Sequence, residues 1–164
     1  YEADDLIASL VIKYKDEFNL FLKKYQIVLI DNPPALNSFN RFSLLLANYV
    51  LIPLIEEKFC YLGLTDAIDT INIMRRLNPD FIDYLGFSSR HKGSRTVLHD
   101  NMYNLFKDQL KENFIENVIP ESIIIAERST KKNNIFDEYP NHNVTEKIKN
   151  LFDNLFLKMF VERG

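Results

Sequence analysis

Hydrophobic residues follow two different spacings along this chain of 164 residues. In residues 3–24, 59–77, 96–114 and 144–161 they recur at every third or fourth position, which is the period of an amphipathic helix. Elsewhere they form short unbroken runs that end at proline or at polar residues. Such runs are typical of strands that are buried on both faces of a parallel sheet. The pattern therefore predicts that helices and strands alternate.

The unbroken runs predict strands at residues 26–30, 49–55, 81–89 and 117–120. A further helix is expected to begin at Asn37 or Ser38, either of which can cap it, and to end near Asn48. Residues 121–143 are polar and are expected to be irregular. Strands that alternate with helices form βαβ units with right-handed crossovers. We therefore predict an α/β fold, a three-layer sandwich with a mostly parallel sheet between its helices.

The expected strand at 26–30 leads directly into an acidic residue. Asp31 follows the apolar run, and Pro33 and Pro34 come next. Because proline has no N–H for a sheet ladder, Asp31 is expected at the carboxyl end of a central strand. Ligands bind at that edge of open α/β sheets, and a carboxylate there needs a cation, a water or a phosphate-linked metal as its partner. The alternative is an aspartate that caps the following turn.

Composition narrows the class of protein. The chain is 46% hydrophobic and 26% charged, as expected of a soluble globular protein, and its formal net charge is −3. That charge excludes a global basic signature for nucleic acid and leaves room for a local basic patch. Cys60 is the only cysteine, which excludes an intrachain disulfide and fits a reducing cytosol. The first residues, YEADD, are neither a signal peptide nor an initiator methionine, so the chain is expected to begin inside a longer one.

Four segments of the chain carry motifs whose order along the sequence indicates a resemblance to a known family. They are IVLIDNPPAL, then YVLIPLIEEKFCYLGLTDAIDTI, then Gly86 followed by Arg95-Thr96, and finally VIPESIIIAERSTKKNNIFDEYP. In this order and spacing they resemble the C-terminal half of the ParA/MinD family of deviant Walker-type partition ATPases, and they are closer to ParA. The resemblance implies that residues 1–164 are the C-terminal portion of a Rossmann-like P-loop NTPase domain.

The chain also departs from that family's pattern. The phosphate-binding loop, K-G-G-x-G-K-[ST]-T, is absent, and no glycine-rich turn replaces it. Glu121 stands where ParA proteins usually have arginine, and Arg90 replaces a usual small polar residue near the base pocket. The base-binding end is therefore expected to be unusual.

The resemblance assigns nucleotide-site roles to several residues. The segment 26–31 corresponds to the Walker B strand, in which Asp31 holds Mg²⁺ beside the phosphates of ATP, through water. The nucleotide is expected to be bordered by Pro33, Pro120, Glu121 and Arg90. For Glu121, an ordinary turn after a strand is the alternative. The implied cofactors are ATP and Mg²⁺.

The segment 86–140, which by resemblance holds base-binding and DNA-facing parts, also carries a basic set. Its members are Arg90, Lys92, Arg95, Arg128, Lys131 and Lys132. Phosphate contacts with counterion release supply most of the affinity for non-specific DNA. The resemblance implies that Arg95 contacts DNA in this way. The further candidates for DNA contact are Lys92, Arg128, Lys131 and Lys132. Solvated loop charge is the alternative for each lysine.

The function implied by the resemblance is ATP-dependent partition of plasmids or chromosomes. It implies a homodimer on non-specific DNA, a ParB-like centromere-binding partner, no membrane, and a cytoplasmic, nucleoid-associated location. Two alternatives remain. One is a DNA-binding or adaptor domain that keeps the fold without ATP hydrolysis, which the missing phosphate loop favours. The other is a MinD-like membrane positioner, which would use the amphipathic helix at 144–161.

The remaining polar candidates carry weaker signals. Glu56 and Glu57 are expected to be solvated in a loop after Pro53 rather than to form a pair of catalytic carboxylates. The histidines lack the spacing of metal ligands and are expected to be at the surface or satisfied by hydrogen bonds. Cys60 is expected to be a small buried apolar side chain.

Overall fold

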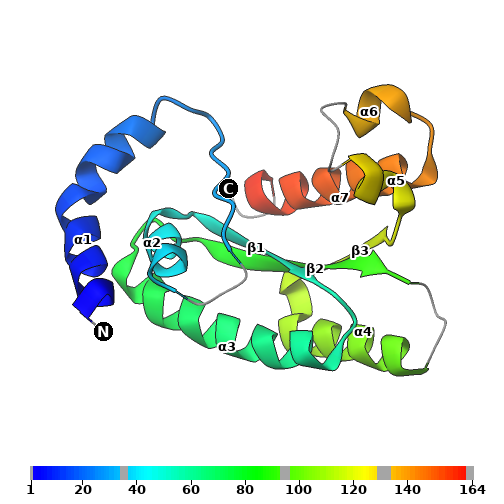
Figure 1. Cartoon of the computed structure of the whole chain (residues 1–164), viewed down its shortest axis with the longest axis horizontal. Coiled ribbons are helices and arrows are strands. Elements are labelled where there is room, and N and C mark those ends of the chain that lie inside the picture. Colours follow the sequence, from blue (N-terminus) through cyan, green and yellow to red (C-terminus); the bar gives the residue numbers. More distant parts are fainter. Residues whose placement is uncertain (1, 34–36, 93–96, 129–133, 162–164) are drawn as a thin grey trace. The chain divides into compact units, whose positions relative to one another are not determined.

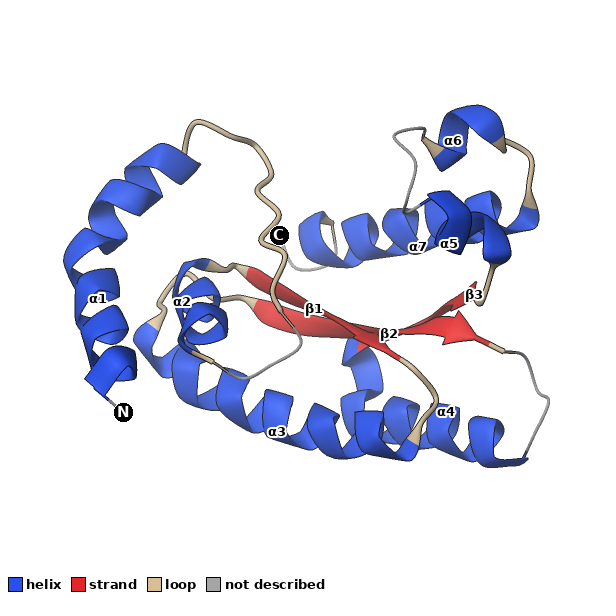
Figure 2. Cartoon of the chain, in the orientation of Figure 1, coloured by secondary structure: helices blue, strands red, loops and turns tan. Residues whose placement is uncertain are grey.

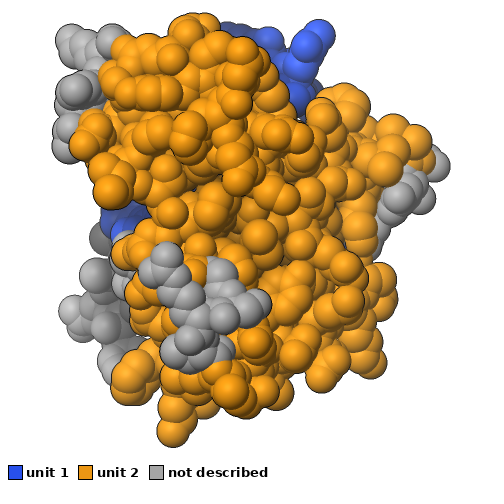
Figure 3. All heavy atoms as spheres, turned by 90° about the vertical axis from the view of Figure 1, so that its right-hand side faces the viewer, with its two compact units in different colours: residues 1–50, 65–83 blue, residues 51–64, 84–164 orange. Residues whose placement is uncertain are grey.

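The computed structural model of this chain describes residues 2–33, 37–92, 97–128 and 134–161 (Figure 1). The chain divides into two compact units, which Figure 3 colours separately. Unit 1 comprises Tyr1–Val50 and Thr65–Asp83, and unit 2 comprises Leu51–Leu64 and Tyr84–Gly164. Each unit is described by itself below.

The chain contains a parallel sheet of three strands. Its strands are β1 (Tyr49–Leu54), β2 (Asp83–His91) and β3 (Phe114–Pro120), in the order β1-β2-β3. In the parallel pairing of β2 with β3, Gly86 lies opposite Phe114 and His91 lies opposite Pro120. The register shifts twice, between Phe87 and Ser88 and between Ser89 and His91. The predicted α/β class with a parallel sheet is confirmed.

Helices cover both faces of β3 within unit 2. Helix α4 (Val97–Leu110) lies on one face and α7 (Asn143–Phe160) on the other (Figures 1 and 2). On the α7 side, two leucines from the helix pack with one apolar residue from each of β2 and β3. This cluster comprises Leu85, Ile115, Leu151 and Leu155. The expected helix at 144–161 is therefore formed, and its residues Leu151 and Leu155 pack against the sheet.

The α4 face depends on a glycine. A Cβ atom placed on Gly86 would come within 2.4 Å of Leu110 Cδ1 and 3.5 Å of Leu54 Cδ1. Leu110 at the end of α4 and Leu54 at the end of β1 are both buried. Phe106 of α4 is fully buried and its ring lies 6.2 Å from that of Tyr61. The absence of a side chain at Gly86 thus lets α4 approach the sheet closely.

Unit 1 contains α1 (Glu2–Leu22), α2 (Ser38–Leu46) and the 3₁₀ turn η1 (Arg75–Leu77). The predicted cap of α2 is confirmed, because Asn37 accepts hydrogen bonds from the N–H groups of Phe39 and Asn40. At the other end of α2, the buried Asn78 donates to the carbonyls of Leu44 and Ala47, both at 2.8 Å.

Helix α3 (Lys58–Met74) agrees with the expected helix at 59–77 once η1 is added. Two short helices, α5 (Ile123–Arg128) and α6 (Ile135–Glu138), occupy the region that was expected to be irregular. Four to six residues hold too few helical turns to reveal a period. Among the described residues, no helix combines the length and apolarity that crossing a membrane requires.

The strand predicted at 26–30 is not formed. Residues 27–33 have no regular secondary structure, and Leu29 is 84% exposed. An apolar run becomes a buried strand only where neighbouring strands bond to its backbone and helices cover its faces. No such neighbours bond to this run in the described part of unit 1. The run therefore has the composition of a central strand, but in the described residues it lacks the neighbouring strands that such a strand needs.

Candidate functional site

Asp31 and Pro33, the expected residues on the phosphate side, lie in an exposed loop of unit 1. The loop is fastened to α2 by two hydrogen bonds. Asn40 Nδ2 donates to the carbonyl of Pro33 at 3.1 Å, and Ser43 Oγ donates to Asn32 Oδ1 at 2.7 Å. Within residues 2–33, 37–92, 97–128 and 134–161, no group of three or more His, Cys, Asp or Glu side chains is placed to hold a metal. The Mg²⁺ role of Asp31 therefore stays a prediction.

Three expected nucleotide-site residues meet at one edge of the sheet in unit 2. Pro120 ends β3 and lies opposite His91, the last residue of β2. The backbone N–H of Glu121 donates to the carbonyl of His91 at 2.9 Å. Arg90 Nη2 lies 3.3 Å from Glu121 Oε1, so the two side chains form an exposed ion pair. A guanidinium and a carboxyl group thus stand side by side at the carboxyl ends of neighbouring parallel strands.

Arg90 adopts an unusual backbone conformation in order to reach this position. Its φ angle is 56°, in the left-handed region, and the register of β2 shifts between Ser89 and His91. A residue with a Cβ atom rarely adopts this region, because Cβ then crowds the following carbonyl. The left-handed residue and the bulge together turn the end of β2 out of its regular pleat.

The expected basic patch lies only partly within the described residues. Lys92 is exposed directly after β2. Arg95, Lys131 and Lys132 lie outside the residues that the structure describes. Arg128 is engaged within unit 2, because its guanidinium is paired with Glu138 and its Nη2 donates to the hydroxyl of Tyr139 at 3.0 Å. DNA contact by these residues stays a prediction.

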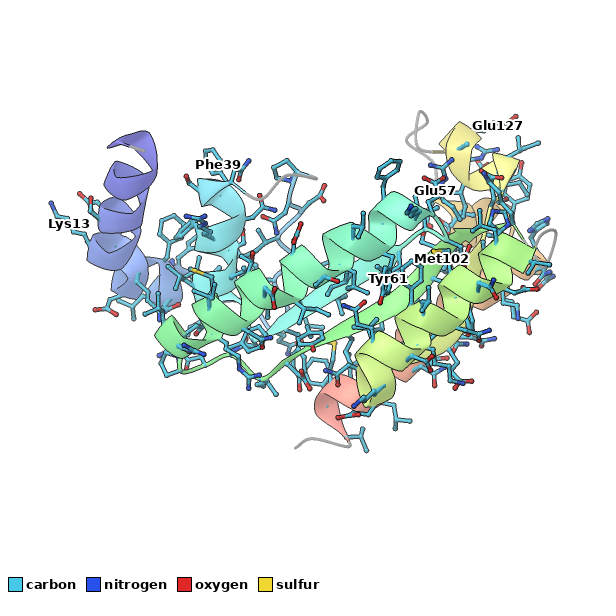
Figure 4. All side chains as sticks on the ribbon, turned by 90° about the horizontal axis from the view of Figure 1, so that it is seen from below. Lys13, Phe39, Glu57, Tyr61, Met102 and Glu127 are labelled. Carbon is cyan, nitrogen blue, oxygen red and sulfur yellow. The ribbon has the colours of Figure 1, made fainter. Side chains whose placement is uncertain are left out.

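A buried carboxyl group, which sequence reasoning missed, lies behind this edge. Glu56 follows β1 and is only 3% exposed. Its Oε1 accepts hydrogen bonds from Ser88 Oγ and from His91 Nδ1, the latter at 2.9 Å. The expectation that Glu56 is solvated is therefore wrong, whereas its neighbour Glu57 is exposed at the start of α3 (Figure 4). Ser88 and His91 were the available signal, because polar residues in a buried strand need hydrogen-bond partners.

Cys60 lies beside the same loop and is half-buried. The backbone N–H of Ile55 donates to its sulfur at 3.4 Å. Burial raises the pKa of the thiol, the hydrogen bond from Ile55 lowers it, and the nearby charges of Glu57 and Glu56 raise it further. Of the other histidines, His142 caps α7 by accepting from the N–H of Val144 at 3.2 Å, so it is satisfied as expected.

The chain is similar to known proteins over a large part of its length. A family model described as an AAA domain matches residues 5–82. An uncharacterised protein of Pseudomonas putida is 33% identical over 111 residues, which cover 63% of this chain and 39% of that protein. The chromosome partitioning protein ParA of Myxococcus xanthus is 26% identical over 70% of this chain and 41% of its own length.

Two further matches point the same way. A ParA family protein of Mycoplasma genitalium is 28% identical over 56% of this chain and 33% of its own length. The crystal structure of a plasmid partition protein from Borrelia burgdorferi superposes with a TM-score of 0.58 at 21% identity, over 84% of this chain and 51% of that one. It shows that the predicted P-loop NTPase-like fold is present. The chain spans about half or less of the length of these relatives. Together, these matches show that the chain is similar in sequence and fold to ParA-like partition ATPases.

Proposed function

We propose that this chain is part of an ATP-dependent DNA-partition protein in which it supplies the base-binding side of the nucleotide site. The observation that carries the proposal is the Arg90–Glu121 pair, 3.3 Å apart at the carboxyl ends of β2 and β3. In open parallel sheets this edge is where ligands bind. The guanidinium offers hydrogen-bond donors and the carboxyl group offers acceptors, so both kinds of group on a purine edge can be recognised.

The phosphate side of the proposed site rests on Asp31 and Pro33. In phosphoryl transfer, Mg²⁺ neutralises charge on the β- and γ-phosphates. The proposal gives Asp31 the role of holding that ion through water, and Pro33 that of stiffening the segment after it. No K-G-G-x-G-K-[ST]-T loop is present in the 164 residues. The protein made from its complete natural reading frame is therefore the one to test.

The proposed DNA contacts come from the basic residues of two segments. Lys92 and Arg95 follow β2, and Lys131 and Lys132 follow α5. Arg128 contributes differently, because its pairing with Glu138 and Tyr139 holds α5 against α6 beside the second segment. As in the family, the proposal includes a homodimer, which a ParB-like partner stimulates to hydrolyse ATP and to leave the DNA.

Nucleotide binding is tested with a fluorescent ATP analogue and Mg²⁺. We expect saturable binding that Arg90→Ala weakens, because the base loses a donor. Arg76→Ala is the matched control, since Arg76 is also an exposed arginine and lies on η1, away from the strand ends in sequence. If the protein neither binds ATP nor hydrolyses it with DNA and partner present, the proposal is wrong.

DNA binding is tested by titrating a random-sequence duplex at several salt concentrations. The slope of log K against log[salt] is negative, and each phosphate contact that is lost should reduce its magnitude by about 0.9. We expect Arg95→Ala to reduce this magnitude and Lys107→Ala to leave it unchanged, because Lys107 on α4 is paired with Glu116. A slope that Arg95→Ala leaves unchanged contradicts the assignment.

The adaptor alternative is favoured by the absence of a phosphate-binding loop from the 164 residues, and the run before Asp31 is also exposed, with Leu29 84% exposed. A protein of that kind would bind DNA with the same salt dependence whether or not ATP is present. The membrane alternative has less support, because Leu151 and Leu155 of α7 are buried against the sheet. Sedimentation with anionic liposomes, with and without residues 144–164, separates that alternative from the other two.

A further inference from the structure

We propose that Glu56 is a positioning residue for base selectivity, acting through Ser88 and His91 on the Arg90–Glu121 pair. This inference rests on the proposed function, because it concerns the same edge of the sheet. Glu56 does not reach the edge itself, since it is buried behind it. Its effect passes through hydrogen bonds that all lie within unit 2.

The two partners of Glu56 bracket Arg90 along the strand. Ser88 comes before Arg90 and is fully buried, and His91 comes directly after it. Both donate to the same atom, Glu56 Oε1. One carboxyl oxygen therefore holds the backbone on both sides of the residue that carries the unusual conformation.

That conformation needs such support. The φ angle of Arg90 is 56°, which is unfavourable for a residue with a Cβ atom and persists only where the surroundings hold it. The bulge between Ser89 and His91 removes part of the regular ladder with β3 at the same point. The bonds to Glu56 replace this lost restraint from the side of β1.

The turn at Arg90 is what brings its side chain to Glu121. Successive side chains of a regular strand point to opposite faces of the sheet. The left-handed residue breaks this alternation, and Arg90 Nη2 comes within 3.3 Å of Glu121 Oε1. Glu121 is itself fastened to the same point, because its N–H donates to the carbonyl of His91 at 2.9 Å. His91 thus connects Glu56 to both members of the pair.

The ring of His91 is restrained from the helical side as well. Tyr103 of α4 lies edge-on to it, with 6.3 Å between the ring centroids. A ring held between Glu56 and Tyr103 has little freedom to turn, so the carbonyl of His91 stays where Glu121 needs it. Positioning of this kind lets a site separate two ligands that differ in one donor or acceptor, because a misplaced polar group loses its hydrogen bond.

The consequence is a defined preference among purine nucleotides. Adenine carries an amino donor at C6 where guanine carries a carbonyl acceptor, and their N1 atoms differ in the opposite sense, so a fixed Arg90–Glu121 pair binds them unequally. When Glu56 is lost, the end of β2 relaxes and the pair samples several arrangements. We then expect the ratio of ATP to GTP affinity to move toward one, by roughly five- to tenfold, as for the loss of one hydrogen bond.

The experiment measures the affinities for fluorescent ATP and GTP analogues in the protein made from its complete reading frame. Glu56→Ala and His91→Ala are each expected to reduce the selectivity ratio, and the double variant to reduce it no further, because the two act along one path. Glu57→Ala is the matched control, as an exposed carboxyl group one residue away, and should leave the ratio unchanged. His91→Asn keeps a donor near the place of Nδ1 and should restore most of the ratio.

Thermal unfolding is recorded for every variant. If Glu56→Ala lowers the Tm but leaves the selectivity ratio unchanged, Glu56 is only structural and the inference is wrong. If Glu56→Ala does not fold, the comparison of His91→Ala with His91→Asn decides, because equal ratios in those two variants also contradict the inference. Failure of the unchanged protein to bind either nucleotide is a different result, since it overturns the proposed function and the inference with it.

Discussion

Arg128, the last residue of α5, forms an ion pair with Glu138, the last residue of α6. The guanidinium also donates to the hydroxyl of Tyr139 at 3.0 Å and lies over its ring, 5.1 Å from the centroid. The hydrogen bond to Tyr139 and the charge of Glu138 raise the pKa of Arg128, although desolvation opposes them. One side chain thus joins two helices that are too short to be stable alone.

We expect Arg128→Ala to lower the Tm by several degrees, because it removes the ion pair, the hydrogen bond and the ring contact together. Arg128→Lys should recover little, since an ammonium group cannot reproduce the planar contacts of a guanidinium. The side chain of Arg128 is only 15% exposed. Arg90→Ala breaks the more exposed Arg90–Glu121 pair and serves as the control, with a Tm near that of the unchanged protein. If calorimetry shows that Arg128→Ala and Arg90→Ala lower the Tm equally, this account is contradicted.

Gly86→Ala should destabilise unit 2. The new Cβ would lie 2.4 Å from Leu110 Cδ1, and Leu110 is held in the buried α4 face. Overpacking of this kind costs about 1–3 kcal/mol in the free energy of unfolding, which chemical denaturation measures. Adding Leu110→Ala creates room for the methyl group, so the double variant should lose less than the sum of the two single losses.

Gly63→Ala is the opposite case and the matched control for Gly86. Gly63 lies inside α3, and no atom comes within 4 Å of the place where its Cβ would be. Alanine is the better helix former, by about 0.5–1 kcal/mol, so this variant should be more stable than the unchanged protein. If both substitutions change the stability in the same direction, the space around Gly86 is not what distinguishes them.

Much of the fold was predictable because long helices carry their own signal. α1, α3, α4 and α7 each contain several turns, so apolar residues at every third or fourth position revealed them. The run at 26–30 shows the limit of such reasoning. Its composition indicates a buried strand, but burial depends on partner strands that the sequence of the run does not contain. Leu29 is accordingly 84% exposed.

The candidate site was predictable only in part. Arg90, Pro120 and Glu121 were found through their resemblance to a family, and the structure brings them to one edge. Glu56 could not be found in this way, because its burial depends on Ser88 and His91, which lie more than thirty residues further along the chain. A contact over that separation is fixed by strand register, and bulges shift the register of β2 twice.

Asn78→Ala should destabilise unit 1 by about 1–3 kcal/mol, because the carbonyls of Leu44 and Ala47 at the end of α2 lose their donor. Asn78→Asp keeps the oxygen that accepts from the N–H of Asp80 but removes both donated bonds. It also places a negative charge at a helix C-terminus, which the helix dipole disfavours. The aspartate variant should therefore be no more stable than the alanine variant in denaturant titration. A stable Asn78→Asp variant would show that the donated bonds contribute little.

Alkylation of Cys60 should be slow at neutral pH and should accelerate only in alkaline solution. Burial raises the pKa of this thiol above its ordinary value of 9.0, so little of the reactive thiolate is present at pH 8. The rate of reaction with iodoacetamide is measured from pH 7 to 10.5. It should therefore reach half of its maximum at a higher pH in the folded protein than in the same chain unfolded in urea. Glu57→Gln should move the midpoint down, because the charge of Glu57 contributes to the rise.

The same shift has a consequence for stability. A thiol with a higher pKa in the folded state holds its proton more tightly there than in the unfolded chain. The folded state is therefore not penalised below about pH 9, and it loses stability as the pH rises from that value through the folded pKa. Cys60→Ser removes this titration, so the difference in Tm between the unchanged protein and the variant should change above pH 9 and stay constant below it. A midpoint of the alkylation rate at or below its value in urea would mean that the sulfur of Cys60 is solvated in the folded protein.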